Sequence, residues 1–303
     1  MSRVPDTDIP ERHPAVRAWA EPADLRRRGV RWFVILAFGC AWIPWFAVYL
    51  AGGSLDDPVI QLLTAAFVPA LAACVVRRWI TRQGFRHSGL RLNLRGSWWH
   101  YAAAVTIPWG VLILAALIAA AVGMWTPQSM DVSASAWLYL AAGPAVCIVL
   151  SPIFWGEEYG WTAYLRDRLV PGRPILTTFL TGLVWGVWHW PLPWVGYFGG
   201  DAPVSDAVWG MLLWLPLSIL LEFLIGWLWS ETASVWPGAM LHAGSNMVAS
   251  LGMTMVFGDA VGITGTTALL CAALTPFVLA VILSGHTGGK RLPAPASPDR
   301  NFA

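Results

Sequence analysis

Long apolar runs separated by short polar stretches make up most of the chain. An α-helix needs about 20 apolar residues to cross the hydrocarbon core of a bilayer. By this rule the sequence predicts an all-α fold, a polytopic membrane bundle of about eight transmembrane helices. The predicted spans are residues 31–51, 58–79, 99–123, 137–165, 174–195, 207–229, 234–257 and 261–284.

The composition agrees with lipid as the solvent of this chain. Charged residues make up 12% of the sequence, whereas soluble proteins carry about 25%. Tryptophan occurs 21 times and is enriched where membrane helices meet the aqueous interface. The formal net charge of +2 gives no reason to expect a nucleic-acid partner. The four cysteines stand singly in apolar stretches and indicate neither a disulfide framework nor a zinc knuckle.

The basic residues test the order of the spans independently. All 19 Lys and Arg residues lie near the two termini, around the connection between the second and third spans, or between the fourth and fifth. Basic residues mark the cytoplasmic side of a membrane protein, so this alternation predicts that both termini are cytoplasmic. The turn between the sixth and seventh spans adds only Glu231 and no basic residue to the pattern.

These observations divide the chain into three parts. We expect a cytoplasmic tail over residues 1–30, a transmembrane domain over 31–285 and a second cytoplasmic tail over 286–303. The first tail is rich in Pro and Arg and lacks the apolar segment of a signal peptide, and we expect its first part to be poorly ordered. These tails and the charge bias suit a multi-pass protein of a prokaryotic plasma membrane.

Several strongly polar side chains fall inside the predicted spans. Such groups are costly in a membrane and are usually functional. Because buried polar groups must find partners, we expect the glutamate pair and the later His and Asn residues to share one polar centre. Either histidine alone would fit a packing role, and Glu222 fits either a structural pair or a cavity. The members of the expected centre are Glu157, Glu158, His189, His242 and Asn246.

Their spacing limits how these side chains can be arranged. Residues four apart share one face of a helix, which places Trp185 beside His189 and His242 beside Asn246. Adjacent residues point about 100° apart, so the two glutamates cannot both aim at one centre. We therefore expect one glutamate to face the reaction and the other to meet a structural partner.

A carboxylate, two imidazoles and a carboxamide suit hydrolysis by an activated water. A glutamate can act as general base, and a His–Asn pair on one face can donate hydrogen bonds to an oxyanion. Ser245 faces elsewhere on its helix than His242, and no other serine is a convincing nucleophile. The chain also has neither G-x-S-x-G nor H-E-x-x-H.

Three stretches resemble the motifs of one family. "GEEYGWTAYL", "GLVWGVWHWPL" and "SVWPGAMLHAGSN" are similar to those of the CPBP family, also called the CAAX-protease and bacteriocin-processing or Abi family. The resemblance covers roughly residues 140–250. It implies an eight-helix intramembrane glutamic endopeptidase related to the Rce-type CAAX prenyl protease.

The resemblance implies roles for the first two motifs. The family pattern E-E-x-x-x-R places the general base on Glu157 and its companion on Glu158. The pattern F-x-x-x-H falls on Trp185 and His189, with Trp in place of Phe. In the family, the glutamate and this histidine are taken to activate water.

The third motif, H-x-x-x-N, falls on His242 and Asn246, which the resemblance assigns to oxyanion stabilisation. The chain departs from the first motif because Thr162 stands where the family has arginine. Arg166, which we expect one turn later on the same face, is a candidate to replace that arginine.

The sequence leads us to expect an endopeptidase that acts on a membrane-associated protein or peptide, without a cofactor, from a site open to the cytoplasm. Three alternatives stay open. Thr162 favours a catalytically impaired relative that serves as a scaffold or in bacteriocin self-immunity. One Glu and two His suit a zinc-dependent variant. A transporter would relay protons through Glu157, Glu158 and Glu222.

Overall fold

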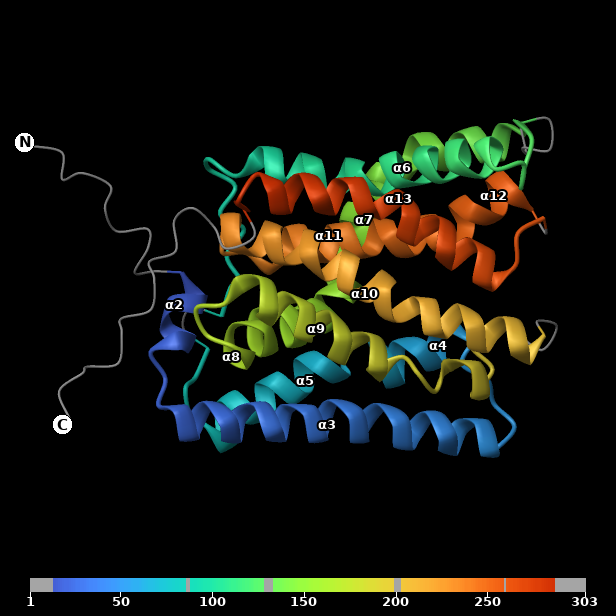
Figure 1. The fold of residues 1–303 in the computed structure, drawn as a ribbon. Coiled ribbons are helices and arrows are strands. Elements are labelled where there is room, and N and C mark those ends of the chain that lie inside the picture. The colour runs from blue at the N-terminus through green and yellow to red at the C-terminus, as the bar shows by residue number, and fades with distance from the viewer. Residues whose placement is uncertain (1–12, 86–87, 128–132, 199–202, 259, 287–303) are drawn as a thin grey trace, which may run out of the picture.

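The computed structural model describes residues 13–85, 88–127, 133–198, 203–258 and 260–286, and within these ranges it contains helices and no strand. The long helices run side by side in one bundle (Figure 1), which confirms the predicted all-α class. The principal helices are α3 (Ala23–Leu50), α5 (Val68–Val75), α6 (Trp98–Ala121), α7 (Ala134–Gly160), α9 (Pro174–Trp188), α10 (Val204–Thr232), α11 (Val235–Met247) and α13 (Ile263–Leu283).

Short elements extend these helices. The second span is completed by α4 (Pro58–Gln61) and the π-helices η1 (Leu62–Ala66) and η2 (Val76–Ile80), which flank α5. Helix α7 continues through the π-helix η4 (Trp161–Arg166) into α8 (Asp167–Leu169). Helix α11 continues through η6 (Val248–Gly252) into α12 (Met253–Phe257). Single π-helical turns inside α-helices are frequent at functional sites, and η4 directly follows the glutamate pair.

Among the described residues, six helices are long and apolar enough to cross a membrane. They correspond to six of the eight predicted spans. The other two predicted spans are α9, which has 15 residues, and α11 with its extensions. Helix α9 is too short by itself to cross a bilayer, whereas α11 carries His242, Ser245 and Asn246, which lower its apolar content. The chain is therefore a multi-pass membrane protein of about eight helices.

Helix α9 ends earlier than predicted. The fifth span was expected to reach residue 195, but the helix stops at Trp188 and a 3₁₀ turn follows, η5 (Leu192–Trp194). Pro191 and Pro193 explain the early end, because proline lacks an N–H donor and disfavours helical geometry at the residue before it. The break leaves His189 at the C-cap of α9.

Residues 13–30 of the predicted first tail are largely helical. Helix α2 (Pro14–Trp19) begins after His13, whose ring nitrogen Nδ1 accepts the N–H of Ala15 as an N-cap. Helix α3 begins at Ala23, eight residues before the predicted start of the first span. Residues 1–12 and 287–303, within the two predicted tails, lie outside the described part of the chain.

Helix packing brings the three motifs together in the middle of the bundle. Helix α7 packs against α5 and α11, and α10 packs against α9, α11 and α13.

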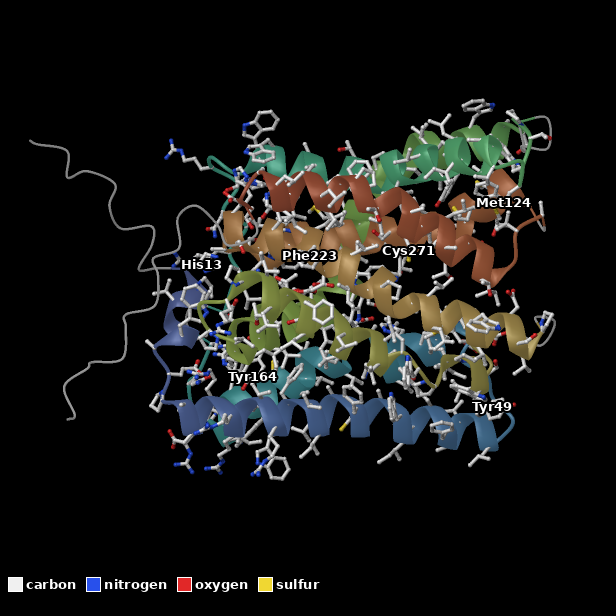
Figure 2. All side chains as sticks on the ribbon, in the orientation of Figure 1. His13, Tyr49, Met124, Tyr164, Phe223 and Cys271 are labelled. Atoms are coloured by element: carbon white, nitrogen blue, oxygen red, sulfur yellow. The ribbon has the colours of Figure 1, made fainter. Side chains whose placement is uncertain are left out.

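Helices α2 and α8, the start of α3 and the last turns of α13 all lie at the left end of the bundle in Figure 1. Long nitrogen-tipped side chains extend from this end, where His13 is labelled in Figure 2.

Paired glycines let the motif-bearing helices approach their neighbours closely. A Cβ at Gly156 would collide with the carbonyl oxygen of Ala66, and one at Gly160 would lie 2.7 Å from the carbonyl oxygen of Pro69. Small residues four apart are a common device for close packing of membrane helices. These contacts fix the rotation of α7 about its axis, and with it the directions of the two glutamates between the glycines.

Candidate active site

Glu158 lies at the centre of the gathered polar groups. Its Oε1 is 2.9 Å from Nδ1 of His242 on α11, and its Oε2 accepts a hydrogen bond of 2.7 Å from the hydroxyl of Thr162. The residue is only 1% exposed. Both carboxylate oxygens are thus held by hydrogen bonds to two different helical segments, so Glu158 has little freedom to turn.

Glu157 points in a different direction and has a different partner. Its Oε2 accepts a 2.9 Å hydrogen bond from the indole Nε1–H of Trp185 on α9. Glu157 is 8% exposed, more than Glu158. Each glutamate therefore meets its own neighbour, in keeping with their divergence on a helix.

His189 is fixed by the backbone of its own helix. Its Nδ1 lies 2.9 Å from the carbonyl oxygen of Trp185. A carbonyl oxygen only accepts hydrogen bonds, so Nδ1 carries the proton and a neutral ring keeps its lone pair on Nε2. No hydrogen bond from Nε2 to another described residue is present. His189 is therefore arranged to accept a proton or to orient a water through Nε2.

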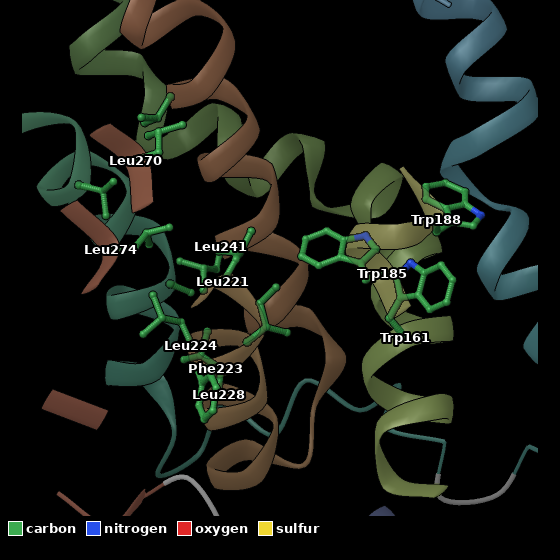
Figure 3. Close-up of a cluster of buried hydrophobic side chains, with 14 of the residues drawn as sticks. Trp161, Trp185, Trp188, Leu221, Phe223, Leu224, Leu228, Leu241, Leu270 and Leu274 are labelled. Atoms are coloured by element: carbon green, nitrogen blue, oxygen red, sulfur yellow. The ribbon is translucent and has the colours of Figure 1, made fainter. Parts of the chain in front are cut away.

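Aromatic rings surround both histidines. The ring of Trp185 lies 5.6 Å from that of His189 and 5.0 Å from that of His242, both edge-on. Trp161, Trp185 and Trp188 lie close together beside the leucine-rich part of the core (Figure 3). Trp185 thus bridges the two histidines and also binds Glu157, which gives the second motif a structural role in the site.

His242 and Asn246 share a face of α11, as their spacing predicts. His242 is 2% exposed, and its Nδ1 is engaged by Glu158. Asn246 is exposed one turn further along, and its side-chain amide forms no hydrogen bond within the described residues. The arrangement leaves Nε2 of His242 and the carboxamide of Asn246 available to a ligand.

The structure separates Thr162 and Arg166 into different roles. Thr162 donates its hydroxyl to Glu158, which a sequence comparison with the motif arginine does not reveal. The ion-pair partners of Arg166 among the described residues are Asp167, at 3.6 Å, and Glu222, at 3.9 Å. These ion pairs of Arg166 thus run to Asp167 and Glu222, and not to the two motif glutamates.

The described side chains offer no ready metal site. No group of three or more His, Cys, Asp or Glu residues within the described ranges is arranged to hold a metal ion. One ring nitrogen of each motif histidine is used by Trp185 or Glu158, and Nε2 is the remaining nitrogen of each. Metal analysis of the purified protein tests the zinc-dependent alternative.

One comparison with known proteins identifies the central part of the chain. Residues 134–248 match the family model of type II CAAX prenyl endopeptidase Rce1-like proteins. The matched region covers α7 through α11 and includes both glutamates, both histidines and the asparagine. It confirms the family resemblance indicated by the three motifs. A comparison with curated proteins found no match.

Proposed function

Because residues 134–248 carry an Rce1-like domain, we propose that the chain is an intramembrane endopeptidase of the glutamic type. It hydrolyses a peptide bond of a membrane-associated protein or peptide with a water that Glu157 activates. Glu158, His189, His242 and Asn246 complete the site.

The proposed reaction needs only groups that this chain supplies. Glu157 takes a proton from water while the water oxygen bonds to the peptide carbon, and His189 orients that water through Nε2. The carbonyl oxygen becomes an oxyanion, which accepts hydrogen bonds from Asn246 and from Nε2–H of His242, whose ring is protonated on both nitrogens while Glu158 accepts from Nδ1–H. When the C–N bond breaks, the proton held by Glu157 passes to the leaving amine.

The unequal hydrogen bonding of the two glutamates is the observation that carries this proposal. Glu158 uses both oxygens on His242 and Thr162, so it is suited to hold the imidazole in place. Glu157 has one hydrogen bond, from Trp185, and is the more accessible of the two. A general base must reach its water, which favours Glu157 for that role.

The family description also suggests a class of substrate. A prenylated C-terminal peptide is the first substrate to test, since the matched family is described as CAAX prenyl endopeptidases. We propose a prokaryotic plasma membrane as the location, with the site opening toward the cytoplasm. The basic connection after the motif helix supports this orientation.

A comparison of protein N-termini in cells tests the proposal. Wild type and Glu157→Gln are expressed at matched levels, and new N-termini in the membrane proteome are identified by mass spectrometry. Termini that appear with wild type and not with Glu157→Gln establish proteolysis and reveal the cleavage site. Identical sets of termini would contradict the proposal and favour the scaffold alternative.

A further inference from the structure

The polar network extends beyond the five motif residues to Glu222 on α10. Resting on the proposed function, we infer that Glu222 is a positioning residue of this site. It holds the guanidinium of Arg166 next to the Thr162–Glu158 hydrogen bond and thereby keeps Glu158 and His242 in their working geometry. Thr162 and the Arg166–Glu222 pair then share the task of the arginine in the family motif.

Helix α10 is shaped to receive the side chain of Arg166. Glu222 Oε1 lies 3.9 Å from Arg166 Nε, and the hydroxyl of Ser230 accepts a 3.3 Å hydrogen bond from Nη2. Between them, a Cβ at Gly226 would lie only 2.7 Å from Arg166 Nε. The three α10 residues are spaced four apart, so they line one face of the helix and form a cradle for the guanidinium.

Glu222 also reaches the catalytic side of the network. It is 1% exposed and lies close enough to Glu158 and Thr162 to interact with them electrostatically, but neither of its carboxylate oxygens forms a hydrogen bond with a described residue. The single hydroxyl proton of Thr162 is committed to Glu158. Glu222 therefore acts on the Thr162–Glu158 pair through its charge and through Arg166, and not by a hydrogen bond to Thr162.

Charge explains why Arg166 is needed at this depth. Glu222 and Glu158 are carboxylates of different helices in a dry interior, where two uncompensated negative charges would repel each other strongly. His242 faces Glu158, and Arg166 faces Glu222. Each carboxylate thus has its own basic partner, which lets both stay near Thr162.

Variants of Glu222 and Thr162 test this inference with purified protein in lipid nanodiscs. The probe is an internally quenched peptide that spans the cleavage site found by the N-terminus comparison, and rates are normalised to folded protein. We expect Glu222→Gln to lower kcat about 10- to 100-fold, as loss of a supporting partner of a functional group commonly does, with little change in KM. Glu231→Gln, the same change on the same helix, serves as the matched control.

Coupling between variants separates positioning from simple damage to the fold. Thr162→Val should resemble Glu222→Gln, the double variant should be little worse than either single variant, and Thr162→Ser should retain activity. Multiplicative losses in the double variant would overturn the inference. The pH profile of kcat/KM gives a second criterion. If Glu222→Gln lowers kcat/KM by the same factor at every pH, the variant has merely lost active protein, and the inference is overturned.

A substitute variant and a separate control for the proposed function complete the experiment. If Glu222→Gln does not fold, Gly226→Ala replaces it, since it displaces the guanidinium without altering an ionisable group. Loss of kcat supports the inference, and wild-type kcat in folded Gly226→Ala contradicts it. Cleavage by wild type and none by Glu157→Gln verifies the proposed function separately, so failure of that function is not mistaken for failure of the inference.

Discussion

Two clusters of buried polar side chains lie on either side of the π-helix η4, and they differ in how completely their polar atoms are used. The motif cluster consists of Glu157, Glu158, His189 and His242. Within the described residues, both of its histidines keep Nε2 without a hydrogen bond. Polar atoms left available in a buried site can bind a substrate or a water, which fits a cluster that performs chemistry.

The end cluster, formed by His13, Glu21, Asp167, Arg168 and Trp229, has most of its polar atoms in hydrogen bonds, with Asp167 Oδ2 as an exception. His13 uses Nδ1 on the backbone of α2 and Nε2 on the carbonyl of Trp229, at 3.1 Å. The guanidinium of Arg168 binds Glu21 at 2.5 and 3.2 Å. The indole of Trp229 donates to Asp167 at 3.0 Å.

The engagement of these atoms indicates a different task for each cluster. The end cluster fastens α2 and the start of α3 to α8 and α10, immediately beyond the motif helix. Its hydrogen bonds hold structure together and leave little room for a ligand. Changes in the motif cluster should therefore affect turnover first, and changes in the end cluster should affect stability first.

The largest expected effect is on turnover, from Glu157→Gln. This change keeps the shape of the side chain but removes the general base, and should lower kcat by about 10²- to 10⁴-fold. The thermal midpoint should stay close to that of wild type. Steady-state kinetics and thermal unfolding of the same preparations check both parts, with Glu231→Gln as the control. Normal turnover by Glu157→Gln would remove the basis for the proposed mechanism.

His242→Gln should also reduce turnover, through loss of an oxyanion donor and of the partner of Glu158. We expect kcat to fall by about 10²- to 10³-fold, which is the usual effect of removing one oxyanion donor. Single-turnover kinetics measures the loss, and His286→Gln, at a partly exposed histidine beyond α13, is the matched control. Equal rates for the two variants would contradict the assigned role.

In the end cluster, Arg168→Met should destabilise the protein without abolishing turnover. Removing one member of a buried ion pair leaves the other charge unpaired and costs about 3 kcal/mol. The double variant with Glu21→Gln should recover part of the loss, because no lone carboxylate remains. Thermal unfolding in detergent measures stability, and a loss of kcat per folded molecule would break the contrast between the clusters.

The smallest expected effect is the pH dependence of the attachment of α2. Burial lowers the pKa of His13 from 6.5 to about 4, so the unfolded chain binds this proton more readily than the folded one. The contribution of His13, at most about 3 kcal/mol, is therefore complete above pH 6.5 and is lost as pH falls toward 4.

The variant His13→Asn isolates this effect. Asparagine is a good N-cap and does not titrate, so it keeps the start of α2 while removing the proton. The fall of the thermal midpoint between pH 7 and pH 4 should be smaller in His13→Asn than in wild type. Identical pH dependence in the two proteins would assign the effect to other groups.

The spans were predictable because a bilayer demands long apolar runs. The predicted spans 99–123, 207–229 and 261–284 differ by at most three residues at either end from α6, α10 and α13. The residue at which α9 ends was predicted wrongly, because a hydropathy window does not take into account that proline ends helices. The predicted span 137–165 reached all but the last residue of η4, and α8 was missed because the buried residues that follow include Arg166, Asp167 and Arg168, which an apolar window rejects.

The sequence singled out the candidate residues, but it determined fewer of the contacts between them. Spacing placed His242 with Asn246 and separated the two glutamates, but it could not tell which glutamate meets His242. That choice depends on the rotation of α7, which Gly156 and Gly160 set against α5 and its flanking turn. Their G-x-x-x-G spacing was a visible signal.

The supporting residues were harder to find. Arg166 was expected to stand in for the missing arginine at 162, yet its partner is Glu222 on another helix. The spacing of Glu222, Gly226 and Ser230 four apart along α10 was a signal for a polar face. Only the packing of α10 beside η4 reveals that this face receives an arginine.

Purified wild type and Glu157→Gln, reconstituted in lipid nanodiscs, test the central claim most directly. Each is incubated with the peptide identified in cells, with and without a metal chelator, and the products are measured by mass spectrometry. The account predicts cleavage by wild type at equal rates with and without chelator, and none above background by Glu157→Gln. Equal cleavage by both proteins, or activity that the chelator abolishes and zinc restores, would contradict it.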